Sequence, residues 1–341
     1  MTDFAGWLMP LRYTSETAEH KAVRTAAGLF DLSHMGEIAV TGPEAAEALD
    51  YALTGQLSAA KPGRARYTMI CAPDGGVLDD LVVYHQEPGR YLVVANASNT
   101  PLVLEELRAR CKPAVVTDET ERTALIAVQG PNAQGILAPF TGLDLATLRY
   151  YAGAYADVAG RPAWVARTGY TGEDGFEVFC RAEDAELIWT GLANQGNPNP
   201  TPAGLAARDT LRLEAGMPLY GNELSPEVTP YEAGLGRVVK LDKPCDFVGR
   251  DALAERAAAG PRQTLTGLIA KSRRVPRHGY AVVAEDGTRC GIVTSGAPSP
   301  TLGVPIAMAY LEAGTARPFG IDIRGKTEEA DIVDLPFYRR S

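Results

Sequence analysis

Short runs of alternating apolar and polar residues recur along the chain, and one pair of them predicts a hairpin. Residues 163–167 and 176–179 have strand patterns, and three glycines within seven residues lie between them, which is typical of a tight turn. Successive side chains of a strand point to opposite faces, so Glu177 points away from the face that Phe176 and Val178 share. A carboxylate there is either solvated or held by a fixed partner, and the pattern alone favours solvation.

Predicted strands and helices alternate over the first 255 residues. Periodicity and end signals predict helices at residues 16–27, 44–53, 100–109, 183–193 and 203–216. Apolar and β-branched runs predict strands at residues 36–41, 67–71, 81–84, 91–95 and 123–131. Residues 195–202 are rich in Gly, Asn and Pro and predict a loop. Because hairpin signals recur, antiparallel sheets with helices on one side, an α+β fold, are favoured over a doubly wound parallel sheet.

A change of pattern at residues 255–263 marks the predicted domain boundary. Beyond this stretch, short strands at residues 281–284 and 291–294 flank an Asp-Gly turn. That pattern is typical of a small all-β barrel or sandwich. We therefore expect two regions, residues 1–257 and residues 264–341.

Composition and charge exclude several classes of protein. The chain has 341 residues, of which 45% are hydrophobic and 22% charged, as in soluble globular proteins with a sizeable core. Neither a membrane-spanning run nor a signal peptide is evident, so we expect a cytoplasmic protein. The net charge of −9 disfavours nucleic-acid binding. An anionic small molecule would need a local basic patch, and the densest one is residues 271–277.

Cysteine and histidine positions predict neither a disulfide framework nor a metal site. The five cysteines are scattered and never spaced C-x-x-C, and the four histidines are equally dispersed. The sequence also lacks the glycine-rich motifs of dinucleotide and P-loop nucleotide sites. No recognisable Ser–His–Asp or Cys–His signature appears, which leaves positioning and charge stabilisation of a reactive cofactor as the expected chemistry.

Two arginines on the predicted helix 203–216 are candidate functional residues. Arg208 and Arg212 are four residues apart and share a face, whereas Asp209 is turned away by about 100°. Their mutual repulsion calls for carboxylates or an anionic ligand, and Glu177 is one candidate partner. An exposed helix with surface salt bridges is the alternative, but the helix is largely apolar, which favours paired or functional charges.

A pair of acids, Asp79 and Asp80, lies between a predicted turn and the next strand. Paired carboxylates can serve a site, but solvated side chains next to a turn are the commoner case. The pattern therefore favours the solvated interpretation.

Several long motifs resemble the aminomethyltransferase, or T-protein, family of the glycine cleavage system. They cover essentially the whole chain: FAGW at 4–7, GLFDLSHM at 28–35, GGVLDDL at 75–81, TGYTGEDGFE at 168–177, GLAARDTLRLEAG at 204–216, LYG at 219–221 and TSGAPSP at 294–300. The resemblance implies a central site between three subdomains, two of them interleaved α+β units and the last a small β-barrel. It also implies that an aminomethyl group on the lipoyl arm of H-protein passes to tetrahydrofolate with release of ammonia, alongside the other glycine cleavage components.

The resemblance assigns folate-binding roles to individual residues. Glu177 matches the residue that binds the pterin, where a carboxylate accepts two parallel hydrogen bonds from the pterin amino group and the adjacent ring N–H. The other matched positions are Tyr170, Met35, Arg208 and, at the C-terminus, Tyr338. The basic run 271–277 is expected to bind the folate's glutamate tail or acidic H-protein, or else to be a solvated loop.

One departure from the family pattern concerns an Asp expected after the strand 91–95, where this chain has Val103. Glu105 is rotated by about 200° around the helix and does not substitute. The site then uses another acid or water, or turns over more slowly. Alternatively, the protein is another folate-dependent demethylase or a folate-binding protein without turnover. As an isolated residue, Val103 is expected to pack with Leu107 in a core.

Overall fold

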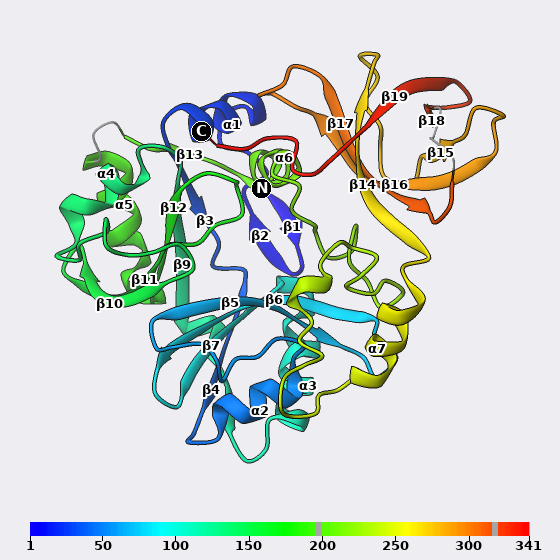
Figure 1. The fold of residues 1–341 in the computed structure, drawn as a ribbon. Coiled ribbons are helices and arrows are strands. Elements are labelled where there is room, and N and C mark those ends of the chain that lie inside the picture. Colours follow the sequence, from blue (N-terminus) through cyan, green and yellow to red (C-terminus); the bar gives the residue numbers. More distant parts are fainter. Residues whose placement is uncertain (196–198, 316–319, 341) are drawn as a thin grey trace.

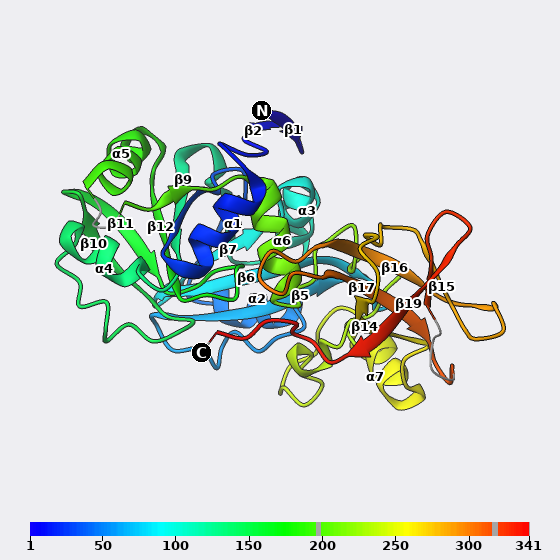
Figure 2. The same ribbon diagram turned by 90° about the horizontal axis from the view of Figure 1, so that it is seen from above.

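The computed structural model describes residues 1–195, 199–315 and 320–340, and residues 196–198 of the predicted loop 195–202 lie outside them. Two sheets and a barrel surround a central region (Figure 1). The chain opens with a small two-stranded hairpin, β1 (Thr2–Phe4) and β2 (Trp7–Met9), which lies over the central region in Figure 1 and at one edge of the molecule in Figure 2.

The first sheet has five antiparallel strands in the order β5-β6-β7-β4-β8. Its strands are β4 (Gly36–Thr41), β5 (Arg64–Cys71), β6 (Val77–Glu87), β7 (Arg90–Ala95) and β8 (Val115–Asp118). Helices α2 (Ala45–Ala52) and α3 (Thr100–Arg110) cover one face of this sheet. The core between them contains Ile38, Val40 and Leu49, all fully buried. Alternation along β4 turns the other side chains of that strand toward the second sheet.

The second sheet has six strands in the order β10-β11-β12-β9-β3-β13. Its strands are β3 (Gly28–Asp31), β9 (Thr123–Gln129), β10 (Gly153–Val158), β11 (Arg161–Ala166), β12 (Gly175–Arg181) and β13 (Thr201–Pro202). β13 runs parallel to β3, and the other pairs are antiparallel. Helices α4 (Ala133–Leu137) and α5 (Ala185–Gln195) lie on its outer side. The chain enters this sheet at β3, leaves for the first sheet and returns at β9, so the two units are interleaved.

The inner faces of the two sheets pack together with α1 (Glu16–Thr25) and α6 (Leu205–Glu214). Their shared core contains Phe30, Leu92, Leu125 and Leu211, each at most 4% exposed. Short 3-10 turns complete this region at η1 (Ala97–Asn99), η2 (Thr120–Arg122), η3 (Ala138–Phe140), η4 (Ala182–Asp184) and η5 (Gly236–Val238). The helices predicted from periodicity are thus confirmed, and so is the α+β class.

The C-terminal strands close into a six-stranded barrel in the order β14-β17-β16-β15-β18-β19. They are β14 (Gln263–Ala270), β15 (Ala281–Val283), β16 (Arg289–Pro298), β17 (Pro305–Glu312), β18 (Gly320–Asp322) and β19 (Thr327–Val333), and α7 (Arg250–Ala259) precedes them. Alternating buried residues such as Leu268, Val282 and Ile321 fill the interior. Of the two all-β architectures that the sequence left open, the barrel is the one that forms.

Buried polar contacts join the barrel to the first two sheets. Glu214, which is 0% exposed, accepts hydrogen bonds from Arg24 on α1 at 3.0 Å and from the Thr301 hydroxyl of the barrel at 2.7 Å. Arg24 also pairs with Glu173 in the hairpin turn at 2.8 Å. The segment after β19 then runs from the barrel back toward α1 and the sheets (Figure 2). These contacts fix the barrel and the hairpin turn relative to each other.

The described residues include no membrane-spanning helix, no metal-binding cluster and no disulfide. Within residues 1–195, 199–315 and 320–340, no helix is long and apolar enough to cross a bilayer. Over the same ranges, no group of three or more His, Cys, Asp or Glu side chains is arranged to hold a metal ion. All five cysteines are free, and four of them are buried.

Candidate functional site

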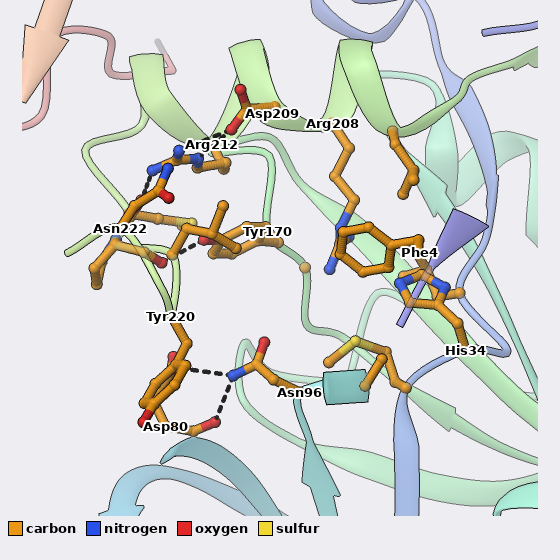
Figure 3. Close-up of a pocket in the computed structure, with 18 of the residues that line it drawn as sticks. Phe4, His34, Asp80, Asn96, Tyr170, Arg208, Asp209, Arg212, Tyr220 and Asn222 are labelled. Carbon is orange, nitrogen blue, oxygen red and sulfur yellow. Dashed lines mark hydrogen bonds and ion pairs between the residues drawn. The ribbon is translucent and has the colours of Figure 1, made fainter. Parts of the chain in front are cut away.

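A cavity of about 920 Å³ lies where the two sheets, α6 and the barrel meet. Strands β5 and β6 and the segment that follows β7 contribute polar side chains to its wall, and the hairpin turn and α6 contribute others (Figure 3). Gly296, Ala297 and Pro298 of the barrel and Phe4 of the N-terminal hairpin complete the lining. The cavity is at the large end of the range of small-molecule sites.

The predicted hairpin forms, and it presents Glu177 to the cavity. β11 and β12 are antiparallel with Ala166 opposite Glu177, and Phe176 and Val178 on the other face are fully buried. The Glu177 Oε2 accepts hydrogen bonds from the Tyr84 hydroxyl at 3.1 Å and from the Thr168 hydroxyl. Glu177 is therefore a half-buried carboxylate with fixed partners, and the solvated interpretation is wrong. Its Oε1 makes no hydrogen bond within the described residues, which leaves one oxygen for a ligand.

The turn of this hairpin is held by Gln129 at the end of β9. The Gln129 amide donates to the Thr168 carbonyl at 3.0 Å and accepts from the Thr171 hydroxyl at 3.0 Å. A side chain at Gly169 would collide with Gln129, and Gly172 has a φ of +81°. Glycines are therefore required at both positions. These contacts hold the turn next to Gln129 at the start of the strand that carries Glu177.

Asp79 and Asp80 are strand residues of β6, and the solvated interpretation of this pair is wrong. Asp79 is 0% exposed, and Asp80 lines the cavity. The Asp80 Oδ2 accepts a hydrogen bond from the Tyr67 hydroxyl at 3.0 Å, and its Oδ1 accepts one from the Asn96 amide at 2.8 Å. Burial raises the pKa of the Asp80 carboxyl. Sheet pairing brings Tyr67 on β5 and Asn96, which directly follows β7, to this point, and the turn signal alone did not indicate this.

The two arginines of α6 have different surroundings. Arg208 points into the cavity toward Phe4 and His34 (Figure 3). Its guanidinium lies 4.9 Å from the centre of the Tyr170 ring, and among the described residues it has no acidic partner. Burial lowers the pKa of Arg208, but a guanidinium remains charged at neutral pH. Arg208 is thus a cation available to an anionic ligand.

Arg212 is instead a structural ion-pair residue. It is 1% exposed and bonds Glu223 at 3.0 Å and Asp209 at 2.7 Å. Asp209, which is rotated by about 100° from Arg208, pairs with Arg212 because residues three apart on a helix are neighbours. Glu177, in turn, is paired with hydroxyls rather than with an arginine.

Met35 and its neighbour His34 also line the cavity. Burial, followed by the nearby Arg208 charge, lowers the pKa of His34 to about 3, so the imidazole is neutral. The Phe4 ring meets it edge-on with centroids 5.4 Å apart. Met35 and Tyr170 therefore both reach the cavity as expected, while His34 was missed because a lone histidine gives no distinctive signal.

Tyr338, which the resemblance also matched, is not among the residues that line this cavity. Its backbone N–H donates to the Glu214 carbonyl at 2.8 Å, and its ring stacks on the Arg24 guanidinium at 4.1 Å. The C-terminal segment thus contacts the C-terminal end of α6.

The basic run 271–277 is divided between surface pairs and the cavity. Lys271 pairs with Glu329 and Asp331, and Arg274 pairs with Glu328, all on β19. Arg277 lines the cavity. One residue of the run therefore faces the site, and at least two neutralise acids on the barrel.

Val103 is fully buried in the core between α3 and the first sheet, where Leu107 is buried as well. It faces away from the cavity, so an acid at this position would enter the core rather than the site. The acid that this chain presents to the cavity from the first sheet is Asp80.

Comparison with known proteins agrees with this arrangement along the whole chain. The model of the GCVT N-terminal domain matches residues 1–243, and that of the glycine cleavage T-protein C-terminal barrel domain matches residues 263–339. The chain belongs to the glycine cleavage T-protein family. An aminomethyltransferase from Streptomyces coelicolor is 61% identical over 350 residues, which cover 100% of this chain and 94% of that protein. One from Bacillus subtilis is 44% identical, with 99% and 95% covered.

A solved T-protein structure has the same fold. The glycine cleavage system aminomethyltransferase T from Bartonella henselae superimposes with a TM-score of 0.91 at 36% identity, covering 99% of this chain and 93% of that one. These comparisons make this T-protein an aminomethyltransferase, an enzyme that transfers a one-carbon unit in glycine cleavage. They do not favour the alternatives of a different folate-dependent demethylase or a protein without turnover.

Proposed function

We propose that the cavity binds tetrahydrofolate and receives an aminomethyl group from the lipoyl arm of H-protein. In this reaction the C–S bond to the lipoyl sulfur and the C–N bond to the amine break, and two bonds form between the carbon and folate nitrogens. The two protons that the folate nitrogens lose balance those gained by the thiol and by ammonia. The observation that carries the proposal is that Glu177 and Asp80 line one cavity, each oriented by its own hydrogen bonds.

Glu177 would bind the pterin ring. Its Oε2 is held by Tyr84 and Thr168, so the plane of the carboxylate is set before a ligand arrives. A planar donor pair, such as the pterin amino group and its neighbouring ring N–H, fits a carboxylate edge as an arginine fork does. The chain therefore supplies a pre-oriented acceptor with one unengaged oxygen.

Asp80 would act at the reacting carbon. Tetrahydrofolate supplies the nitrogen nucleophiles, and the carbon they attack becomes electron-poor as its bonds to sulfur and nitrogen weaken. A buried carboxylate opposite that carbon stabilises the developing positive charge, and it can accept a proton from the attacking nitrogen. Because Tyr67 and Asn96 hold Asp80 in place, little reorganisation is needed during the reaction.

Arg208 and Arg277 would bind the carboxylates of the folate's glutamate. Both line the cavity, and Arg208 carries its charge on a half-buried side chain over the Tyr170 ring. A guanidinium with unused donors binds a carboxylate through charge-assisted hydrogen bonds. The net charge of −9 makes such local cations necessary for an anionic ligand.

The activity has a direct test. Purified protein, aminomethylated H-protein and tetrahydrofolate should release ammonia and form 5,10-methylene-tetrahydrofolate. Omitting H-protein or folate should reduce the release to the uncatalysed rate. Ammonia release no faster than without enzyme would refute the proposed function.

Glu177→Gln should weaken tetrahydrofolate binding by about 2–3 kcal/mol, or about 30–160-fold, because one of the two charge-assisted hydrogen bonds is lost and an amide N–H₂ opposes a pterin donor. Calorimetric titration measures the change. Glu183→Gln, at a side chain 69% exposed, is the matched control and should bind folate normally. Equal affinity of the Glu177 variant and the native protein would remove Glu177 from the folate site.

Arg208→Met should weaken binding of tetrahydrofolate by about tenfold, because a charge-assisted hydrogen bond to a carboxylate contributes about 1.5–3 kcal/mol and bulk water offsets part of the loss. A reduced pterin without the glutamate should bind the variant and the native protein alike. Equal losses for both ligands would show that Arg208 does not contact the glutamate.

A further inference from the structure

Asn96 connects the two acids of β6 through one amide group. Its Nδ2 donates to the Asp79 Oδ1 at 2.8 Å and to the Asp80 Oδ1 at 2.8 Å. The two oxygens are therefore at most about 5.6 Å apart, twice the length of either bond. The Asn96 backbone N–H also donates to the Asp79 Oδ2 at 3.0 Å, and the Asn99 amide donates to the Asp79 Oδ1 at 2.7 Å. Asp79 thus holds the residue that orients Asp80.

Among the described residues, no positively charged side chain forms an ion pair with the Asp79 or the Asp80 carboxylate. Asp79 is also fully buried. The titratable groups that face the pair from other elements are phenols: Tyr67 on β5, Tyr151 before β10, Tyr170 in the hairpin turn and Tyr220 after α6. Burial above all raises the pKa of each phenol, so all four are neutral at physiological pH.

Adjacent buried carboxylates without a cation resist ionising together, because the second charge must form next to the first in a medium of low polarity. Burial, followed by repulsion from Asp80, raises the pKa of Asp79 to about 7. Two acids coupled in this way lose their protons in two steps, and the pKa of each step describes the pair rather than one residue.

We propose that Asp79, Asn96 and Asp80 form one acid pair that takes up a single proton near neutral pH, with Asp79 as the positioning residue for Asp80. The role of Asp80 in the transfer rests on the proposed function, whereas the shared proton does not. Asp79 has no contact with the cavity. Through Asn96 it fixes the direction of the Asp80 carboxylate, and through its charge it sets the pH at which the pair becomes fully ionised.

The titration can be followed in the free protein by NMR of aspartate labelled with ¹³C at the carboxyl carbon. The native protein should show an upper step between about pH 6 and 8 and a lower step for the same pair. Asp79→Asn should leave one step for Asp80, at least one pH unit below the native upper step. Asp144→Asn, at an exposed loop, is the control and should leave both steps unchanged. Absence of a native step above pH 5.5, or its persistence in Asp79→Asn, would overturn the proposal.

Asn99→Ala gives a second test should Asp79→Asn fail to fold. It removes one donor from Asp79 and leaves both acids in place, so the upper step should rise by about one pH unit. An unchanged upper step in this variant would overturn the pair by itself.

Turnover separates positioning from general damage to the fold. Asp79→Asn should lower kcat with little change in KM, and its kcat should lose the pH dependence that the native enzyme shows around the upper step. A variant with lower kcat and the native pH profile would refute the coupling. If the native protein shows no aminomethyl transfer, the proposed function fails, and the NMR titration still decides whether the acid pair exists.

Discussion

Asp80→Asn should lower the rate of aminomethyl transfer by about 10²–10³-fold while changing tetrahydrofolate affinity by no more than about threefold. The amide keeps the shape of the side chain and one acceptor oxygen, so the cavity and its hydrogen bond from Tyr67 are largely preserved. The negative charge that would stabilise the reacting carbon is removed, and losses of this size are typical when one charge-stabilising group is deleted. Ammonia release at saturating H-protein and folate measures the effect.

A matched control is available in the same cavity. Asp3 also lines it but is exposed on the N-terminal hairpin, so Asp3→Asn should transfer at the native rate. If Asp80→Asn loses folate affinity in proportion to its activity, Asp80 binds the ligand rather than assisting the chemistry. Native turnover in Asp80→Asn would contradict the role proposed for it.

Val103→Asp should destabilise the protein by about 4–5 kcal/mol without increasing its activity. Val103 is 0% exposed in an apolar core, and a carboxylate placed there has no partner for its charge. Urea denaturation measures the loss at neutral pH. The deficit should shrink as the pH falls from neutral toward about 4, because the buried carboxyl takes up a proton in the folded chain at a higher pH than in the unfolded chain, where its pKa is about 3.9.

The neighbouring position provides the comparison for this variant. Leu102 is 38% exposed on the same helix, so Leu102→Asp should cost less than about 1 kcal/mol. A stable and more active Val103→Asp protein would mean that residue 103 reaches the cavity and that the site lacks an acid there.

Local periodicity predicted which way the important side chains point, but it could not predict what they meet. Strand alternation placed Glu177 opposite Phe176, as observed. Its partner Tyr84 lies on another sheet and 93 residues away in sequence, so the choice between a solvated and a fixed carboxylate depended on tertiary packing. Helical spacing likewise placed Arg208 and Arg212 on one face, while the positions of Glu223 and Tyr170 determined their different roles.

Asp79, Asp80 and Tyr338 are further residues whose contacts local sequence patterns could not predict. Asp79 and Asp80 follow a strong turn signal, which suggested solvent, but β7 then delivers Asn96 to both. Tyr338 was expected in the site from its position in the family pattern alone. Its location depends on the path of the segment after the barrel, which no local pattern encodes.

The contacts of Glu214 have a consequence for the order in which the enzyme matures during synthesis. Glu214 joins Arg24, near the start of the chain, to Thr301, which is made almost three hundred residues later. Arg24 also holds the turn of the hairpin that carries Glu177. In a nascent chain the cavity therefore stays incomplete until the barrel residues that line it have been made and the barrel docks. Premature termination before the barrel would leave Glu214 without its hydrogen bond from Thr301, whereas its contact with Arg24 and the Arg24–Glu173 pair involve only residues that are already made.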